Sequence, residues 1–145
     1  MTIARVLPRT TAALDPGAIV ASTAEATLRG NVFFNGPRAG INANDGFGGG
    51  DEIARNLVFS TCRESGDHGP FNSWDRQPFL TEVAHGEPSY DAAMNSVDHN
   101  LIIANYGSSQ GFDTDDGSSW YHIHDNFFFG AEGVKMDYGA HNAQF

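Results

Sequence analysis

Residues 31–34 read Asn-Val-Phe-Phe, an asparagine followed by three apolar residues. The same pattern returns as Asn-Leu-Val-Phe at 56–59, Asn-Leu-Ile-Ile at 100–103 and Asn-Phe-Phe-Phe at 126–129. Successive asparagines are 25, 44 and 26 residues apart, so the middle interval equals one period plus an insertion of 44 − 25 = 19 residues. Recurrence at a nearly fixed period is the signature of a repeat architecture.

A second short strand is expected in each repeat, directly after a glycine. Residues 41–46, 112–117 and 134–139 alternate apolar and polar side chains, which is typical of a half-buried strand. In the second repeat the best match begins at Gly66, although it fits poorly. From residue 31 onward no stretch has the apolar spacing of a helix.

A unit of about 25 residues with two or three short strands suits one coil of a parallel β-helix, in which coils stack about 4.8 Å apart. We therefore predict an all-β solenoid of about four coils in which the equivalent asparagines form a hydrogen-bonded ladder. The first and third residues of each triplet are expected to line the core, which leaves the middle residues as an outward apolar stripe. An antiparallel sandwich is the rival architecture. The stripe comprises Phe33, Val58, Ile102 and Phe128.

The predicted coils span residues 29–145, with a long loop inserted at 76–94. Residues 1–28 are the candidate N-terminal cap, with a short helix expected over 18–28. No cap is visible before Phe145, which suggests a fragment or a partner over the C-terminal coil. Both the open end and the apolar stripe are candidates for self-association.

Composition excludes several classes of function. The 145 residues carry 8 Lys+Arg against 18 Asp+Glu, a net charge of −10 that disfavours binding to nucleic acid or to an anionic membrane. No apolar run approaches the roughly 20 residues of a membrane span, and no signal peptide is visible. The single cysteine, Cys62, precludes an internal disulfide.

Three segments, Gly36–Asn42, Arg63–Arg76 and Asp113–Ser119, resemble those of right-handed parallel β-helix proteins of the pectin-lyase-like superfamily. This resemblance covers roughly residues 29–142. It implies a right-handed helix, a polysaccharide substrate and an extracellular location. Superfamily members share no single catalytic motif, so the chemistry must be argued from the residues.

Alignment at Gly40, Gly66, Gly111 and Gly133 places polar side chains in two columns that are expected to face solvent. Asp115 and Asp137 would lie about 5 Å apart on adjacent coils, near the separation of retaining glycosidases. The Cα atoms of Asp113 and Asp115 would lie about 6.6 Å apart on one strand, near the lower end of the carboxyl separations found in inverting glycosidases. The alternative is that these aspartates cap turns, which we favour for Asp45 and Asp116. The columns read Asn42, His68, Asp113, Lys135 and Asn44, Pro70, Asp115, Asp137.

These patterns predict a glycoside hydrolase that uses paired carboxylates and no cofactor. Aromatic rings beside carboxylates suit sugar recognition, because apolar sugar faces stack on an indole. The predicted catalytic residues are Asp113, Asp115, Asp137, Asp67 and His68. The predicted substrate-binding residues are Trp74, Asp75, Arg76, Asn42, Asn44 and Lys135.

Two other functions remain open. A polysaccharide lyase would hold Ca²⁺ between the substrate and carboxylates such as Asp113, Asp115, Asp116 and Asp137, with Lys135 or Arg76 as base. A non-catalytic solenoid would bind a glycan or a protein. His122-Ile123-His124 has a spacing that metals use, but without a third histidine or a cysteine at matching spacing we interpret it as two surface histidines and predict no metal site.

Overall fold

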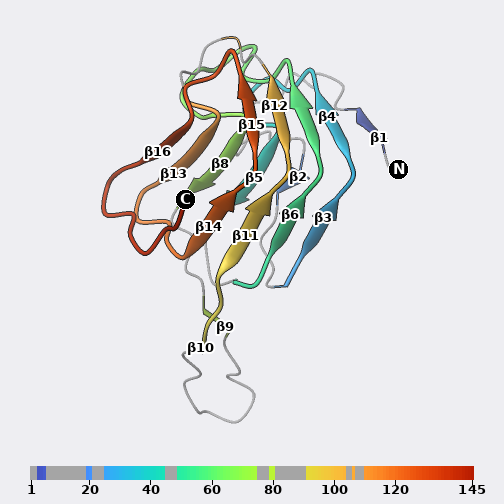
Figure 1. Ribbon diagram of the computed structural model, residues 1–145. Helices are drawn as coiled ribbons and strands as arrows, with labels where there is room; N and C mark the ends of the chain where they lie inside the picture. Colours follow the sequence, from blue (N-terminus) through green and yellow to red (C-terminus); the bar gives the residue numbers. More distant parts are fainter. Residues whose placement is uncertain are drawn as a thin grey trace.

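The computed structural model describes residues 3–5, 19–20, 25–44, 49–74, 79–80, 91–103, 106 and 110–145. The described chain is all-β, and its strands stack coil upon coil as a parallel β-helix (Figure 1). The described residues contain no helix, and hence none that could span a membrane. The solenoid predicted from the sequence is therefore confirmed.

Three parallel sheets form the walls of the solenoid. Each coil contributes one strand to each wall, except the last, which adds a strand to each of the first two walls and an isolated bridge at Gln144 to the third. The first sheet contains β1 (Ile3–Arg5), β4 (Val32–Phe34), β7 (Leu57–Phe59), β12 (Leu101–Ile103) and β15 (Phe127–Phe129). The second contains β2 (Ile19–Val20), β5 (Ile41–Asn44), β8 (Phe71–Trp74), β13 (Phe112–Asp115) and β16 (Val134–Met136). The third contains β3 (Thr27–Arg29), β6 (Glu52–Ala54), β11 (Asn95–Asp98) and β14 (Tyr121–His124).

The predicted asparagine ladder is present at the corner between the third and first sheets. Asn56 donates from its backbone N and from Nδ2 to Oδ1 of Asn100, at 2.9 and 3.0 Å. Asn31 and Asn100 donate in the same way to Asn56 and Asn126. Because Asn56 and Asn100 are buried, these bonds satisfy amide groups that water does not reach.

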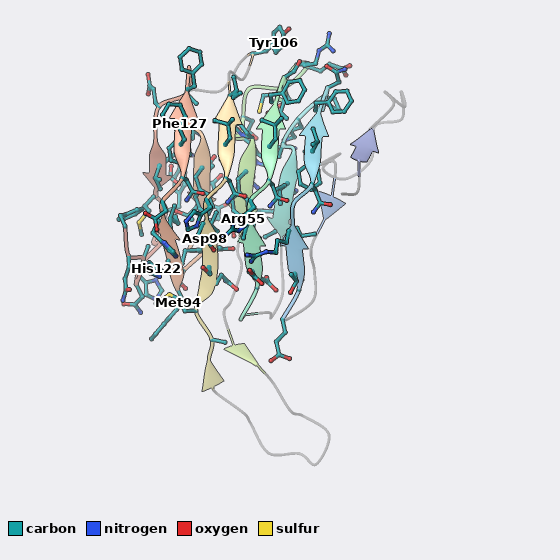
Figure 2. All side chains as sticks on the ribbon, turned by 45° about the vertical axis from the view of Figure 1, so that its right-hand side comes forward. Arg55, Met94, Asp98, Tyr106, His122 and Phe127 are labelled. Carbon is teal, nitrogen blue, oxygen red and sulfur yellow. The ribbon has the colours of Figure 1, made fainter. Side chains whose placement is uncertain are left out.

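The prediction for the apolar triplets was wrong about which residues face inward. Phe33, Val58 and Ile102, the middle residues, are in the core with at most 2% of their surface exposed. Strand side chains alternate, and the ladder asparagine before each triplet already points inward, so the middle residue shares its side. The first and third residues of the triplets therefore form an outward apolar face. On the last coil this face carries the exposed rings of Phe127, which is labelled in Figure 2, and Phe129.

The predicted register of the second repeat was also wrong. Ile41 pairs with Phe71 and Asn42 with Asn72, so Asn72 occupies the column position that had been given to His68. Phe71 stacks on Phe112 of the next coil with ring centroids 4.0 Å apart, as stacked core residues should. The glycines before these strands leave room for the neighbouring coil: a Cβ on Gly111 would lie 2.4 Å from Cδ1 of Phe128.

Two further segments differ in part from expectation. Residues 19–20 and 27–29 are strands that pair with β5 and β6, so the helix predicted over 18–28 does not form there. Within the 76–94 insertion, β9 (Phe79–Leu80) and β10 (Asp91–Ala92) pair as an antiparallel hairpin. Figure 1 shows this hairpin beyond the ends of the sheet strands.

Candidate functional site

Three carboxylates converge at the end of the second sheet, on β13 and just after β16. One carboxylate oxygen from each of Asp113, Asp115 and Asp137 lies within 4.8 Å of the other two. Parallel pairing explains this convergence. Asp113 is in register with Lys135 and Thr114 with Met136, so the same register continued by one residue brings Asp115 beside Asp137. The proximity predicted for Asp115 and Asp137 is therefore confirmed, and it approaches the separation of retaining glycosidases.

Lys135, the only lysine in the sequence, places its ammonium among the three carboxylates. Its Nζ lies 2.9 Å from Oδ2 of Asp137, 3.2 Å from Oδ1 of Asp113 and 3.8 Å from Oδ1 of Asp115. Burial works against the charged lysine, but the hydrogen bond to Asp137 and the charge of Asp113 outweigh it and raise its pKa. Lys135 is therefore held as a cation and neutralises part of the acidic cluster.

The environment of Asp115 shifts its titration toward neutral pH. Burial, the hydrogen bond with Asp137 and the neighbouring negative charges together raise the pKa of Asp115 from 3.8 to about 6, while Lys135 opposes the shift. A carboxyl group that titrates near 6 can hold a proton and release it close to neutral pH. Asp115 is thus the candidate general acid of the cluster.

The expectation that both columns face solvent was wrong for the column of Asn42 and Asp113, which are fully buried. Asn72 donates from Nδ2 to Oδ1 of Asn42 at 2.7 Å, and Gln110 donates to Oδ2 of Asp113 at 3.0 Å. Gln110, which lies just before β13, thus supplies a partner on this side of the sheet. Asp113 is therefore shielded from solvent and acts on the cluster through its charge.

The other column keeps its outward position. Trp74 pairs in register with Asp115 on one side and with Asn44 on the other, and its indole is 39% exposed. Indole Nε1 donates to a carboxylate oxygen of Asp116, which has φ 43° in a turn, as predicted for an aspartate before glycine. The predicted sugar-stacking tryptophan thus lies next to the candidate acid.

Asp67 and His68 do not occupy the column with Asp113. They lie in the connection before β8, where Arg38 Nη2 donates to Oδ2 of Asp67 at 2.6 Å and contacts Nε2 of His68 at 2.8 Å. His68 is buried, and its carbonyl accepts a hydrogen bond from the Cys62 thiol at 2.9 Å. Burial raises the pKa of Cys62 to about 11, so the thiol is inert at neutral pH.

Asp75 and Arg76 lie outside the described residues, as does the side chain of Asn44. Sequence reasoning missed Asn72 and Gln110 as contacts of the site residues, and it placed Asp116 in a turn without anticipating its contact with Trp74. For Asn72 a signal existed: Phe71-Asn72 follows Gly69-Pro70 and repeats the apolar–polar pair that opens the other second strands, Ile41-Asn42 and Phe112-Asp113. Gln110 carried no comparable signal.

The cluster does not suit a calcium ion. Among the described residues, Asp113, Asp115 and Asp137 are the only group of at least three histidine, cysteine or acidic side chains close enough to share a metal. However, the ammonium of Lys135 lies among them, and a second cation at this place would be repelled by it. The calcium-assisted lyase therefore loses its most direct metal site.

Replacing Asp115 with asparagine is expected to stabilise the protein at pH 7 by about 2 kcal/mol. Asp115 titrates at about 6 when folded and at 3.8 ordinarily, so its contribution to stability is complete below pH 3.8 and is lost as the pH rises through 6. Asparagine mimics the protonated acid at every pH. Urea unfolding at pH 7 and pH 3.5 checks this, and an equal gain at both values would contradict it.

Comparison of the chain with known protein families, curated proteins and solved structures found no match.

Proposed function

We propose that the chain hydrolyses glycosidic bonds of a polysaccharide, with Asp115 as general acid and Asp137 as nucleophile. One observation carries the proposal: an exposed indole and a protonatable carboxyl pair lie in a single outward row of the second sheet. Trp74 would stack on a sugar ring, and the adjacent Asp115 would then face the glycosidic oxygen.

The groups present suit a double displacement. Asp137, paired with the Lys135 ammonium, would attack the anomeric carbon while the proton of Asp115 passes to the leaving oxygen as the carbon–oxygen bond breaks. Asp115, now a carboxylate, would take a proton from water, whose oxygen displaces Asp137 and completes the cycle with retained stereochemistry. Asp113 would sustain the raised pKa of Asp115 through its charge.

Asp115→Asn and Asp137→Asn are each expected to lower the release of reducing ends from a responsive polysaccharide by about 10²–10⁴-fold. Wild-type activity should fall as the pH rises through about 6, where Asp115 loses its proton. Asp67→Asn is the matched control, because this carboxylate is 73% exposed and pairs with Arg38. Full turnover in both cluster variants, or no product from neutral and acidic polysaccharides alike, would contradict the mechanism.

A non-catalytic binding solenoid is the second candidate, supported by the outward face of the first sheet. Phe34 stacks on Phe59 with centroids 5.3 Å apart, and Phe127 and Phe129 are more than 60% exposed on the same sheet. Exposed apolar faces of this kind mark binding surfaces. Retention on an insoluble polysaccharide that persists in Asp115→Asn but is lost in Phe129→Ser, without any product, would favour this function.

A further inference from the structure

Two imidazoles lie side by side on the outer surface of the third sheet. His122 and His124 alternate on β14 with Tyr121 and Ile123, which are both buried in the core, so both histidines point outward. Their ring centroids are 4.1 Å apart, with the ring planes inclined by 31°. Histidines two apart on a strand can thus direct nitrogen atoms at one point above the sheet.

Nearby carboxylates fix the orientation of two imidazoles. Nδ1 of His124 lies 2.9 Å from Oδ2 of Asp125, so Nδ1 carries the hydrogen and leaves Nε2 with its lone pair. His99 is oriented in the same way, with its Nδ1 2.8 Å from Oδ2 of Asp98, and its ring centroid lies 6.3 Å from that of His124. A histidine whose Nδ1–H donates to a carboxylate is the usual arrangement of a metal ligand.

The surroundings of the pair also favour a cation. Asp98 is in register with His124 on the neighbouring strand, and Figure 2 shows Asp98 and His122 on the strands of this sheet. Asp98 and Asp125 thus place two carboxyl side chains beside the imidazoles, in a protein of net charge −10.

We propose that His122 and His124 bind a divalent transition-metal ion of the zinc type, with Asp125 orienting His124 and water completing the coordination. Imidazole nitrogen is a preferred ligand of Zn²⁺, and two protein ligands leave an exchangeable, open site. The site lies on a different sheet from the carboxylate cluster and is independent of the proposed hydrolysis. The pairing of β14 with β11 brings Asp98 and the adjacent His99 close to His124. This proximity was not predicted from the sequence.

The proposal is tested by calorimetric titration with Zn²⁺. The full chain is used without a polyhistidine tag and after treatment with a chelator. We expect one zinc ion per chain and at least a tenfold loss of affinity in His122→Ala and in His124→Ala. Asp125→Asn should weaken binding by about 10-fold, because it removes the carboxylate that orients His124. His141→Ala is the matched control, because His141 is not one of the proposed ligands and its Nδ1 is engaged by the Gly139 carbonyl oxygen at 2.9 Å. This variant should bind zinc as the wild type does.

Circular dichroism of each variant, compared with the wild type, separates a lost ligand from a lost fold. Ring-proton shifts of His122 and His124 on zinc addition would locate the ion directly. The proposal is overturned if the wild type shows no saturable binding, or if a folded His122→Ala/His124→Ala double variant keeps wild-type affinity. Binding that disappears in Asp137→Asn and survives in the double variant would place the ion at the carboxylates and would equally overturn it.

Discussion

Replacing Asn100 with alanine is expected to lower the free energy of unfolding by about 3–5 kcal/mol. Oδ1 of Asn100 accepts from the backbone N and Nδ2 of Asn56, and its Nδ2 donates to the Ile53 carbonyl at 2.8 Å and to Asn126. Alanine leaves these buried groups without their partners, and each such group costs about 1–3 kcal/mol. Urea unfolding followed by circular dichroism measures the loss of free energy. In a thermal scan the same variant should melt about 10 °C below the wild type.

Asn31→Ala is the matched control at the N-terminal end of the ladder. The Asn31 side chain donates to Oδ1 of Asn56 at 3.2 Å, and Asn31 is half-buried, so its amide loses less on truncation. We expect a loss of about 1 kcal/mol there. Equal losses at both positions, or less than 1 kcal/mol at Asn100, would show that the ladder does not hold the coils together.

Lys135→Met is the second change with a large expected effect, a loss of about 2–4 kcal/mol at pH 7. The substitution preserves much of the apolar stem but removes the positive charge 3.2 Å from Asp113, which is fully buried. Three carboxylates would then repel one another, and protonation of the cluster would relieve the repulsion. Stability of the variant should therefore recover as the pH falls toward 4, which thermal unfolding across pH 4–8 measures.

Two variants test whether charge is the cause. Lys135→Met combined with Asp113→Asn should regain much of the lost stability, because it removes one of the repelling charges. Arg29→Met breaks an ion pair with Glu52 in which both side chains are more than 40% exposed, so it should cost less than about 1 kcal/mol. A similar loss in Lys135→Met at pH 4 and pH 7 would point to lost packing and against the electrostatic account.

The repeat could be predicted because one feature of the sequence performs the same task in every coil. Each ladder asparagine satisfies backbone and side-chain groups of the neighbouring coil, so the residue recurs wherever a coil turns that corner. A second corner carries a similar device that sequence reasoning missed. Asp51 accepts from the Ala26 backbone N at 2.8 Å, and Asn95 accepts from the Asp51 backbone N at 3.1 Å. Because the residue type varies there, no repeat was visible.

The errors arose where the local pattern fitted two structures. In the triplets all three residues are apolar, so alternation fixes which pairs share a face but not which face is inside. Burial of Asn56 and Asn100 resolves it, because the polar ladder lies on the core side. In the second repeat the connection before β8 is longer, and an alignment anchored on Gly66 selected His68 in place of Asn72. Stacking of Phe71 on Phe112 settles the register.

At the candidate site the sequence predicted proximity, and the tertiary structure decided accessibility. Parallel register alone brings Asp115 to Asp137, because equivalent positions of adjacent coils must lie one strand spacing apart. Burial of Asp113 depends on Gln110, which lies outside the column, and on the conformation of Lys135, its neighbour within the column. The raised pKa of Asp115 follows from the burial of Asp115 itself, from its hydrogen bond with Asp137 and from neighbouring charges, which no spacing along the chain encodes.

The sequence by itself therefore determined the coil period, the ladder and the row that contains Asp115 and Asp137, since backbone pairing repeats them locally from one coil to the next. Only the tertiary structure decided which face is buried, why the pKa of Asp115 is raised and how His124 comes to lie beside Asp98 of another coil. Those properties depend on contacts between segments far apart in the chain and on the exclusion of water between them.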